Sequence, residues 1–355
     1  KNPFKLDLKT ARAKVEELSQ KYNFKLDVDA KVKDLSVGAQ QRVELIKALY
    51  RGADILIMDE PTAVLTPLEV EEFIDAGKSI VFISHKLGEV MNISDRITVL
   101  RSGELVDVVN TKDTTREDLA AMMVGRSVTL SYDKTPVAKA PPLLKIEGIK
   151  AQGDLSASSL KGLSFGIQKG EIVGIAGVDG NGQKELAEVI MGLRPLQEGK
   201  VFYKGQDITG YPTRRRIEQG VAHIPEDRIN EGLILDFSIA ENLVLDNYDQ
   251  EPITKKGVFY PEKVQNLGEK LVREFDVRPP NSEAVVRNLS GGNQQKVVLA
   301  REFSRNPQFI LAMQPTRGLD IGATEFVHQR LLKEKVKGAA ILVISADLDE
   351  VLMVA

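Results

Sequence analysis

The sequence contains 355 residues, which predicts two domains at roughly 150 residues per domain. Its 48 lysine and arginine residues nearly balance 51 aspartate and glutamate residues, and the net charge of −3 lacks the basic excess usual in a nucleic-acid groove. The absence of cysteine excludes disulfides, thiolate zinc sites and a cysteine nucleophile. Apolar runs such as Ile172–Ala176 are too short to span a bilayer, secretory features are lacking, and the chain opens at Lys1, so we expect a soluble protein without its natural N-terminus.

The first predicted elements alternate between helix and strand. A helix-like segment begins at Leu35-Ser-Val-Gly-Ala-Gln-Gln, the apolar run Ile55–Met58 follows it, and a second apolar run covers residues 80–84. An apolar run of this length after a helix is typical of a buried parallel strand. The order of these elements therefore predicts an α/β domain.

The middle of the chain contains a predicted boundary between domains. Thr114-Thr-Arg-Glu117 has the spacing of a capping box ahead of a short helix. Residues 131–142 are polar and contain prolines without hydrophobic periodicity, which is typical of a linker. We expect a first domain over residues 1–130, a linker over 131–142 and a second domain over 143–355, which opens on a strand-like alternation.

A glycine-rich turn follows the apolar run Ile172–Ala176 in the second domain. Glycines between a strand and a helix let backbone N–H groups point at an anion, and the helix N-terminus adds a positive end. Gly177 and Gly182 fit the phosphate-loop template G-x-x-x-x-G-K-[S/T], but Gln183 occupies the lysine position and Lys184 the hydroxyl position. Tight strand–helix packing is the alternative interpretation of this turn.

These two substitutions change what the turn can bind. Gln183 offers a neutral amide where a cation meets the β- and γ-phosphates, and Lys184 cannot ligate Mg²⁺. Loss of one charge-assisted hydrogen bond weakens nucleotide binding by about one to two decades. The backbone cradle survives, so we expect weak nucleotide binding.

The basic run Arg214–Arg216 lies next in chain order, and we expect it on a solvated helix face. Ser238 then opens what looks like an amphipathic helix.

Farther along, the chain repeats its first domain. Leu35-Ser-Val-Gly-Ala-Gln-Gln returns as Leu289-Ser-Gly-Gly-Asn-Gln-Gln, and Pro61-Thr62 returns without a gap as Pro315-Thr316. Apolar runs over residues 309–313 and 341–345 repeat the two strands of the first copy. Repeated elements at this spacing indicate a duplicated domain. The first copy has no counterpart of residues 143–227. It is also seven residues shorter between Thr66 and His85 than the second copy is between Asp320 and Ala346, so we expect a segment of about two helical turns to be absent near Ile74–Gly77, with a shorter helix as the alternative.

The motifs together resemble those of ABC-type ATPases. Leu289–Gln295 resembles their signature motif, Met58–Thr62 their Walker B strand end, and Ile83-Ser-His85 their switch histidine. The duplication, with His223-Ile-Pro-Glu-Asp-Arg228 and Gln314-Pro-Thr-Arg-Gly-Leu-Asp320, is similar to the double-ATPase subunit of simple-sugar and ribonucleoside importers. The resemblance covers nearly the whole chain.

The resemblance implies two ABC-type P-loop NTPase domains, the first incomplete, with mixed and parallel sheets and helical subdomains. It implies ATP and Mg²⁺ as ligands. It places nucleotide contacts at Gly177, Asp179, Gly180, Asn181, Gly182, Gln183, Lys184, Ser36, Gly38, Ser290, Gly291, Gly292, Asn293 and Asp320. For each signature serine the alternative is an ordinary helix N-cap, which explains one copy better than two.

The resemblance also implies catalytic roles in the first copy. Asp59 would hold Mg²⁺ through water, Glu60 would polarise the attacking water, and His85 would sense the γ-phosphate. An isolated Asp-Glu pair is more often a pair of exposed charges, and a lone histidine is more often structural. The strand order, the following Pro61-Thr62 and His85 together favour the catalytic interpretation.

The second copy lacks this set. Met313 replaces Asp59, Gln314 replaces Glu60, Ala346 replaces His85, and Glu226 stands where these ATPases usually have a glutamine. Each such loss commonly costs about 10²–10³ in rate. We therefore expect one competent site that joins Asp59, Glu60 and His85 to Ser290, Gly291 and Gly292, with its phosphate loop in a segment before Lys1. We expect one degenerate site that joins Gly177–Lys184 to Ser36 and Gly38. This fragment is expected to bind nucleotide weakly and not to hydrolyse it.

The family resemblance implies partners as well. We expect a peripheral subunit on the cytoplasmic face of the cell membrane, docked on transmembrane permease subunits and served indirectly by a substrate-binding protein, with no nucleic acid. The imported molecule stays open between a small sugar and a nucleoside. The alternative is a soluble double ATPase that remodels a ribosome or nucleic-acid complex, although DNA-acting relatives usually carry coiled-coil arms or cysteine zinc modules.

Overall fold

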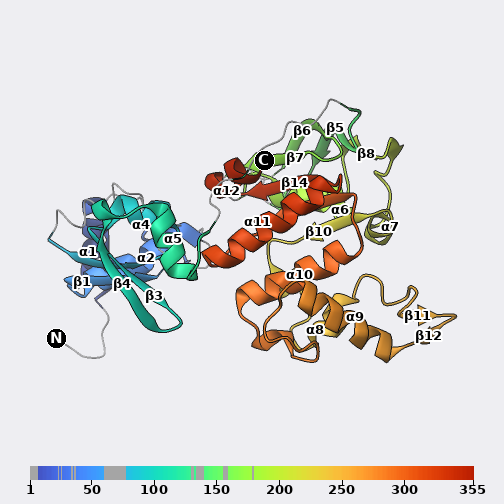
Figure 1. The fold of residues 1–355 in the computed structure, drawn as a ribbon. Coiled ribbons are helices and arrows are strands. Elements are labelled where there is room, and N and C mark those ends of the chain that lie inside the picture. Colours follow the sequence, from blue (N-terminus) through green and yellow to red (C-terminus); the bar gives the residue numbers. More distant parts are fainter. Residues whose placement is uncertain are drawn as a thin grey trace. The chain divides into compact units, whose positions relative to one another are not determined.

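A computed structural model describes residues 7–22, 24, 26–32, 35, 37–59, 77–128, 132, 140–154, 159–177 and 180–355. The chain divides into two compact units, Lys1–Val128 and Thr129–Ala355, drawn in blue to teal and in green to red in Figure 1. Among the described residues, no helix combines the length and apolar character needed to cross a membrane.

The first unit contains two small sheets with helices beside them. The parallel pair β1–β2 stands next to α1 and α2, and the antiparallel pair β3–β4 packs with α4 and α5. The described elements are α1 (Leu8–Lys21), α2 (Val37–Tyr50), β1 (Ile55–Asp59), β2 (Ser79–Ile83), α4 (Leu87–Ile93), β3 (Arg96–Arg101), β4 (Glu104–Asn110), the 3₁₀ turn η3 (Thr111–Asp113) and α5 (Arg116–Val124).

The β1–β2 sheet is buried on one face only. Leu56 and Met58 pack against α1 and α2, whereas Ile55 and Ile57 on the opposite face are 64% and 73% exposed. Parallel sheets are normally covered on both faces. The matching face of the second unit is covered largely by residues 143–203, for which the first copy has no counterpart.

The capping box of α5 lies one residue later than the sequence predicts. Thr115, not Thr114, is the N-cap, and its hydroxyl accepts the backbone N–H of Asp118 while the Asp118 carboxylate accepts the Thr115 N–H. The prediction was wrong by one position because Asp118 serves as well as Glu117 at the third helical position, and the two alternatives differ only in where the helix begins.

The second unit is built on two four-stranded sheets. The parallel sheet has the order β10-β13-β14-β7, and the antiparallel sheet has the order β6-β5-β8-β9 (Figure 1). The strands are β5 (Leu144–Ala151), β6 (Leu160–Ile167), β7 (Ile172–Ala176), β8 (Glu198–Tyr203), β9 (Gln206–Asp207), β10 (Val221–Ile224), β13 (Phe309–Met313) and β14 (Ala340–Ser345).

Helices cover the sheets, and α8, α9 and α10 pack together at one end of the unit near the small hairpin β11–β12 (Figure 1). The remaining elements are α6 (Gln183–Met191), α7 (Thr213–Glu218), the π-helical turn η5 (Arg228–Gly232), α8 (Ile239–Leu243), β11 (Thr254–Lys255), β12 (Val258–Phe259), α9 (Pro261–Glu274), the 3₁₀ turn η6 (Val286–Asn288), α10 (Gly291–Ser304), α11 (Ile321–Val336) and α12 (Leu348–Val354).

The core of this unit lies on both faces of the parallel sheet. Every residue of β13 and β14 is buried, as the continuous apolar runs predict. Alternate side chains of β13 enter two clusters: Ile310 and Ala312 pack with residues of α10 and α11, and Phe309 and Leu311 pack with α6 and the antiparallel sheet. The predicted α/β fold is confirmed.

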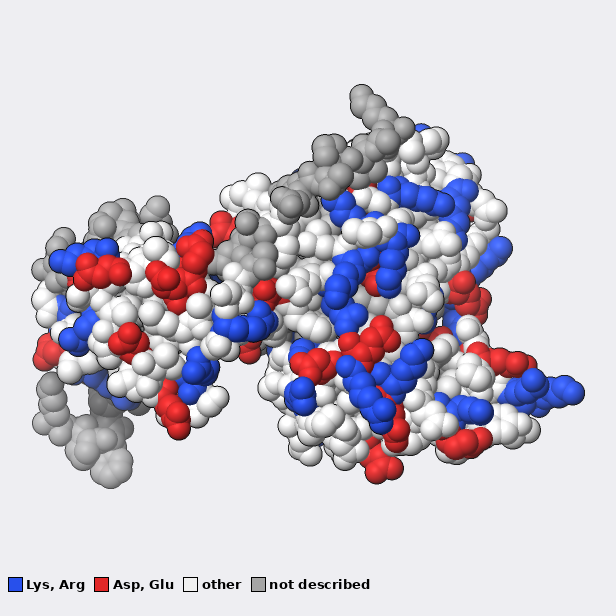
Figure 2. Space-filling view, in the orientation of Figure 1, with Lys and Arg blue, Asp and Glu red and all other residues white. Residues whose placement is uncertain are grey.

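The basic run Arg214–Arg216 is not a uniformly solvated face. Arg216 is only 1% exposed, and its guanidinium donates to the carbonyls of Val189, Ile190 and Ile208, among others. Arg214 forms ion pairs at the surface with carboxylates of the same unit. On the surface shown in Figure 2, basic and acidic side chains stand next to one another on both units.

Candidate functional site

The glycine turn joins β7 to α6, as predicted. Gly180 and Gly182 have φ values of 87° and 102°, which L side chains rarely adopt, and Gly182 is the N-cap of α6. This conformation brings the first turn of α6 directly after the strand, with the N-terminus of the helix at the glycine turn. Asp179 lies outside the described residues.

Gln183 folds back into the turn. Its side-chain Oε1 accepts the backbone N–H of Asn181 at 2.9 Å. A Cβ atom placed on Gly177 would lie 2.8 Å from Gln183 Nε2, so Gly177 leaves room for this amide. The neutral amide therefore uses one N–H donor that a phosphate would otherwise meet.

Lys184 points along α6 rather than into the turn. Its Nζ lies 3.7 Å from carboxylate oxygens of both Asp154 and Glu188, and its side chain is 56% exposed. Arg194 contacts the same two carboxylates more closely, at 2.8 and 2.6 Å. Arg194 therefore neutralises both acids independently of Lys184.

A cavity of about 780 Å³ lies beside the start of α6. Its lining combines Lys184 and Glu188 with Glu226, Arg317 and Met313. Glu226, at the position where a glutamine is expected, forms an ion pair with Arg317. Met313, in the position of Asp59, is buried at the end of β13 and supplies no carboxylate.

Gln314 ties the ends of two parallel strands together. Its backbone N–H donates to the Ile344 carbonyl at 2.7 Å, and its side-chain Oε1 accepts from the Ala346 N–H at 3.3 Å. Its φ of 45° is left-handed. The two positions that correspond to Glu60 and His85 thus bind each other through neutral groups, which cannot act as a base or sense a charge.

The second signature motif forms the start of α10. Ser290 is the N-cap, and its Oγ accepts the Asn293 N–H at 3.4 Å and Asn293 Nδ2 at 3.0 Å. A Cβ atom on Gly291 would lie 2.6 Å from Arg228 Nη2, and one on Gly292 would lie 3.0 Å from the Ala323 side chain. The Arg228 side chain can move away from position 291, whereas the Ala323 side chain leaves little room for a Cβ atom at position 292.

Two further predicted contacts also have structural partners. Asn293 Oδ1 accepts the Arg278 N–H at 2.8 Å, which anchors the loop after α9. Asp320 is the N-cap of α11 and accepts the Ala323 N–H at 2.8 Å. Arg228 joins the same region, because its Nη1 donates to the Arg317 carbonyl at 2.8 Å.

In the first unit, Asp59 and His85 lie at the carboxyl ends of neighbouring strands. Asp59 is the last residue of β1 and is paired in register with Ile83 of β2, two residues before His85. Gly38 falls in the first turn of α2. Ser36 and Glu60 lie outside the described residues.

The sequence profile of the ABC transporter family matches residues 2–63 and 160–317. The nucleoside import ATP-binding protein NupA of Lactococcus lactis subsp. cremoris is 46% identical, over 98% of this chain and 70% of that protein. The chain belongs to the ABC transporter ATP-binding family.

Other relatives agree with this assignment. The guanosine import ATP-binding protein NupO of Bacillus subtilis is 44% identical, over 98% of this chain and 70% of its own length. The glucose import ATP-binding protein TsgD13 of Haloferax volcanii is also 44% identical, over 98% of this chain and 65% of its own length. A nucleotide-free ATP-binding cassette from an ABC transporter matches with a TM-score of 0.51 at 26% identity, over 60% of this chain and 85% of that chain. The family and the fold predicted from the sequence are confirmed.

Sequence reasoning missed a buried charge cluster in this ABC cassette. Arg301 and Glu302 on α10 are 7% and 3% exposed, and Asp246 contacts the Arg301 and Arg305 guanidinium groups at 3.5 and 3.3 Å. His223 donates its backbone N–H to Glu302. Charged residues on a helix normally predict a solvated face, so no sequence signal marked this cluster.

Burial shifts the titration of two members of this cluster. Burial, and then the charge of Glu302, raises the pKa of Asp246 to about 6 against the opposing effect of Arg301 and Arg305. Burial lowers the pKa of His223 to about 4. His223 also lines the cavity beside Lys184, so the cluster reaches that cavity.

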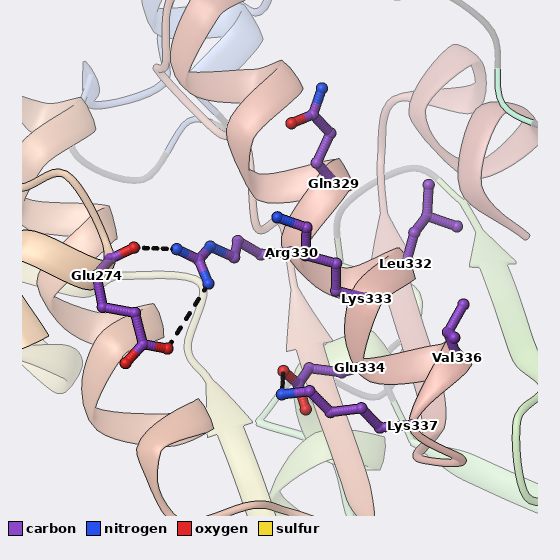
Figure 3. A pocket seen from close by; sticks show the side chains of 8 residues that line it. All are labelled: Glu274, Gln329, Arg330, Leu332, Lys333, Glu334, Val336 and Lys337. Atoms are coloured by element: carbon purple, nitrogen blue, oxygen red, sulfur yellow. Dashed lines mark hydrogen bonds and ion pairs between the residues drawn. The ribbon is translucent and has the colours of Figure 1, made fainter.

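A second, more open cavity of about 640 Å³ lies between α9 and the C-terminal half of α11 (Figure 3). Arg330 crosses it, donates to the Glu274 carbonyl and lies 4.1 Å from the Phe275 ring centroid. Lys337 forms an ion pair with Glu334 at 2.7 Å. No predicted site residue lines this groove, so it is separate from the glycine turn and the signature motif.

Proposed function

We propose that this chain is the ATP-binding subunit that energises import of a small sugar or nucleoside through a membrane permease. In this proposal it is peripheral to the cytoplasmic face of the membrane, contacts transmembrane permease subunits, and serves a substrate-binding protein only indirectly. ATP, with Mg²⁺ at the competent site, is its ligand.

The observation that carries the proposal is the similarity, over 98% of the chain, to import ATP-binding proteins for nucleosides, guanosine and glucose. The difference between the two copies is in keeping with it, because a site that lacks Asp59, Glu60 and His85 equivalents leaves hydrolysis to the other. The alternative, remodelling of a ribosome or nucleic-acid complex, gains no support from these relatives.

We assign the competent site to Asp59, Glu60 and His85, acting with Ser290, Gly291, Gly292 and Asp320. Asp59 is exposed at the end of a strand that is buried on one face, which suits a metal held through water. Mg²⁺ would neutralise charge on the phosphates there. Glu60 polarises the attacking water and His85 contacts the γ-phosphate, while the signature serine and glycines donate hydrogen bonds from a helix N-terminus.

We assign Gly177, Asp179, Gly180, Asn181, Gly182, Gln183 and Lys184, with Ser36 and Gly38, to nucleotide binding without turnover, and Asn293 to nucleotide binding with the second signature motif. In this copy the positions of Asp59, Glu60 and His85 are occupied by Met313, Gln314 and Ala346. None of these side chains can act as a base. Phosphate release by the purified 355-residue chain should therefore stay at background. Phosphate release above background by the purified chain would contradict this assignment.

Transport is tested by co-purification and uptake. A tagged copy, expressed in a cell that contains its permease, should bring down a protein with several membrane spans, and uptake of labelled nucleosides, pentoses and glucose should identify one substrate class. Co-sedimentation with ribosomes, without a membrane partner and without an uptake defect on deletion, would contradict the proposal.

A further inference from the structure

Arg228 lies between the two segments through which the second unit contributes to the proposed competent site. Its Nη1 donates to the carbonyl of Arg317, in the turn that leads to Asp320, at 2.8 Å. Its Nη2 lies against the first residue of α10, because a Cβ atom on Gly291 would be only 2.6 Å from it. One guanidinium therefore lies against both the signature motif and the turn before α11.

A second side chain ties the same turn to α10. Gln295 lies one helical turn after Gly291 and is only 3% exposed, and its Nε2 donates to the Pro315 carbonyl at 2.8 Å. The turn is thus held at two positions, at Pro315 from within α10 and at Arg317 by Arg228. Of the two, Arg228 is the one that reaches the signature glycine itself.

The guanidinium of Arg228 is in an unfavourable electrostatic position. Within the described residues it forms no ion pair, and its Nε is buried without a hydrogen-bond partner. The neighbouring carboxylates are engaged elsewhere, since Asp227 accepts N–H groups of the turn that follows it and Glu226 pairs with Arg317. Burial lowers the pKa of Arg228 against the attraction of Asp227, and the charge of Arg317 lowers it further. The first turn of α10 contains no acidic residue that would offset the positive end of that helix.

These features argue against a stabilising role for Arg228. A partly buried cation without a counter-ion lowers the stability of a fold, and such groups are typical of functional sites. Arg317 is exposed, so water can replace the hydrogen bond to its carbonyl when the guanidinium is removed. Loss of Arg228 should therefore cost the unit no stability.

We infer that Arg228 is a positioning residue for ATP hydrolysis at the competent site, where its planar fork fixes the signature motif at Gly291 relative to the turn at Arg317. This inference rests on the proposed competent site. The signature motif and Asp320 then meet the nucleotide as one rigid surface. A misplacement of about 1 Å in such a surface can lower a rate by about 10²-fold. A lysine cannot replace the fork, because it has a single ammonium in place of two separated N–H₂ groups.

The test is ATP hydrolysis by the complete transporter with Arg228→Met, which removes the fork, and with Arg228→Lys, which keeps the charge. Both should lower kcat by about tenfold or more and leave the KM for ATP within about threefold, because positioning acts on the transition state rather than on nucleotide binding. Arg273→Met, at a side chain on α9 that is 79% exposed, is the matched control and should keep the wild-type rate. A wild-type kcat in either Arg228 variant would overturn the inference.

Two further measurements separate positioning from the alternatives. In urea denaturation of the 355-residue chain, Arg228→Met should have a midpoint at or above the wild-type value, and a lower midpoint would overturn the inference in favour of a structural role. Glu60→Gln in the same transporter tests the proposed function. If it is fully active, the assignment of the competent site fails and the inference fails with it. If it is inactive while Arg228→Met is fully active, the inference alone is overturned.

Discussion

At the scale of single residues, Arg216 shows how a charged side chain can hold a fold together. Its guanidinium donates five hydrogen bonds to backbone carbonyl oxygens, two at the end of α6 and three in the loop before α7. These carbonyls face the protein interior, so loss of the donor leaves them unsatisfied.

Replacement of Arg216 should therefore destabilise the second unit strongly. We expect Arg216→Met to lower the free energy of unfolding by about 3–5 kcal/mol, because several buried carbonyl oxygens lose their donor at once. Arg214→Met is the matched control, because Arg214 makes exposed ion pairs with Glu218 and Asp249, each worth about 1 kcal/mol or less. Urea denaturation of both variants measures the difference. Equal losses in the two would contradict the account.

The sequence predicted the basic run as a solvated face and so was right for Arg214 but wrong for Arg216. In a six-residue helix, one of three consecutive residues points inward. The periodicity of the sequence does not show which carbonyl oxygens would accept hydrogen bonds from it. Those carbonyls come from α6 and a loop before α7, and only the tertiary fold brings them together.

Asp246 and His223 should have opposite effects on stability in the same pH range. The pKa of Asp246 rises from 3.8 to about 6 in the folded state, so its contribution is present at low pH and is lost as pH rises toward 6. The pKa of His223 falls from 6.5 to about 4, so its contribution is present above 6.5 and is lost as pH falls toward 4. Between pH 4 and 6 the two slopes oppose each other.

Single variants should expose each slope. Over this range Asp246→Asn should gain stability with rising pH relative to wild type, by about 2–3 kcal/mol at 1.36 kcal/mol per pKa unit, because Asp246 no longer opposes the His223 effect. His223→Gln should lose stability with rising pH by a similar amount, and wild type should change least. The slope of the unfolding free energy against pH is measured, so any constant loss from the broken ion pairs cancels. Identical slopes of unfolding free energy against pH in all three proteins would show that Asp246 and His223 do not have opposite effects.

At the scale of elements, the contact between α8 and α9 depends on a glycine. A Cβ atom on Gly268 would lie 2.7 Å from the Ala240 Cβ and 3.0 Å from the Ser282 Cβ. Alanine favours a helix over glycine by about 1 kcal/mol, but such crowding costs about 1–3 kcal/mol.

We therefore expect Gly268→Ala to destabilise the unit by up to about 2 kcal/mol, because packing outweighs propensity. Gly210→Ala is the control, because no atom lies within 4 Å of its Cβ position and its φ is not left-handed. The urea midpoint of Gly268→Ala should lie below the wild-type value, and that of Gly210→Ala should lie at or above it. A Gly268→Ala protein more stable than Gly210→Ala would show that the helices move apart easily.

The sequence predicted the elements better than their ends. Strands form at the predicted runs Ile55–Met58, Ile172–Ala176 and residues 309–313. Short continuous apolar runs between helices usually form strands of a parallel sheet. The glycine turn before α6 was likewise predicted. The start of α5 was missed by one residue, because neighbouring threonines and acids offer equivalent caps.

At the scale of the whole molecule, the two units differ in what surrounds their parallel strands. In the second unit β13 is buried throughout, whereas in the first unit Ile55, Ile57, Val81 and Ile83 leave an apolar face exposed. Burial on both faces is what fixes parallel strands in most α/β domains. The sequence predicted this difference in part, because the first copy has no counterpart of residues 143–227, which include the residues that cover the matching face in the second unit.

The chemical asymmetry of the site could be predicted from single positions, but its local interactions could not. Met313, Gln314 and Ala346 follow from the repeat. The fold of Gln183 onto the Asn181 N–H, the pairing of Glu226 with Arg317, and the contact of Gln314 with Ala346 depend on side-chain packing. Gln183, Glu226 and Gln314 thus each have a partner within the unit, in keeping with a copy that binds nucleotide without hydrolysing it.

The central proposal is that hydrolysis depends on the carboxylates of the first unit. Its most direct test is the rate of ATP hydrolysis by the complete transporter in which Glu60→Gln is compared with the matched change Gln314→Glu. We predict a loss of about 10²–10³-fold for Glu60→Gln, and a wild-type rate for Gln314→Glu, because one added carboxylate does not restore the groups missing at Met313 and Ala346. Full activity of Glu60→Gln would contradict the proposal.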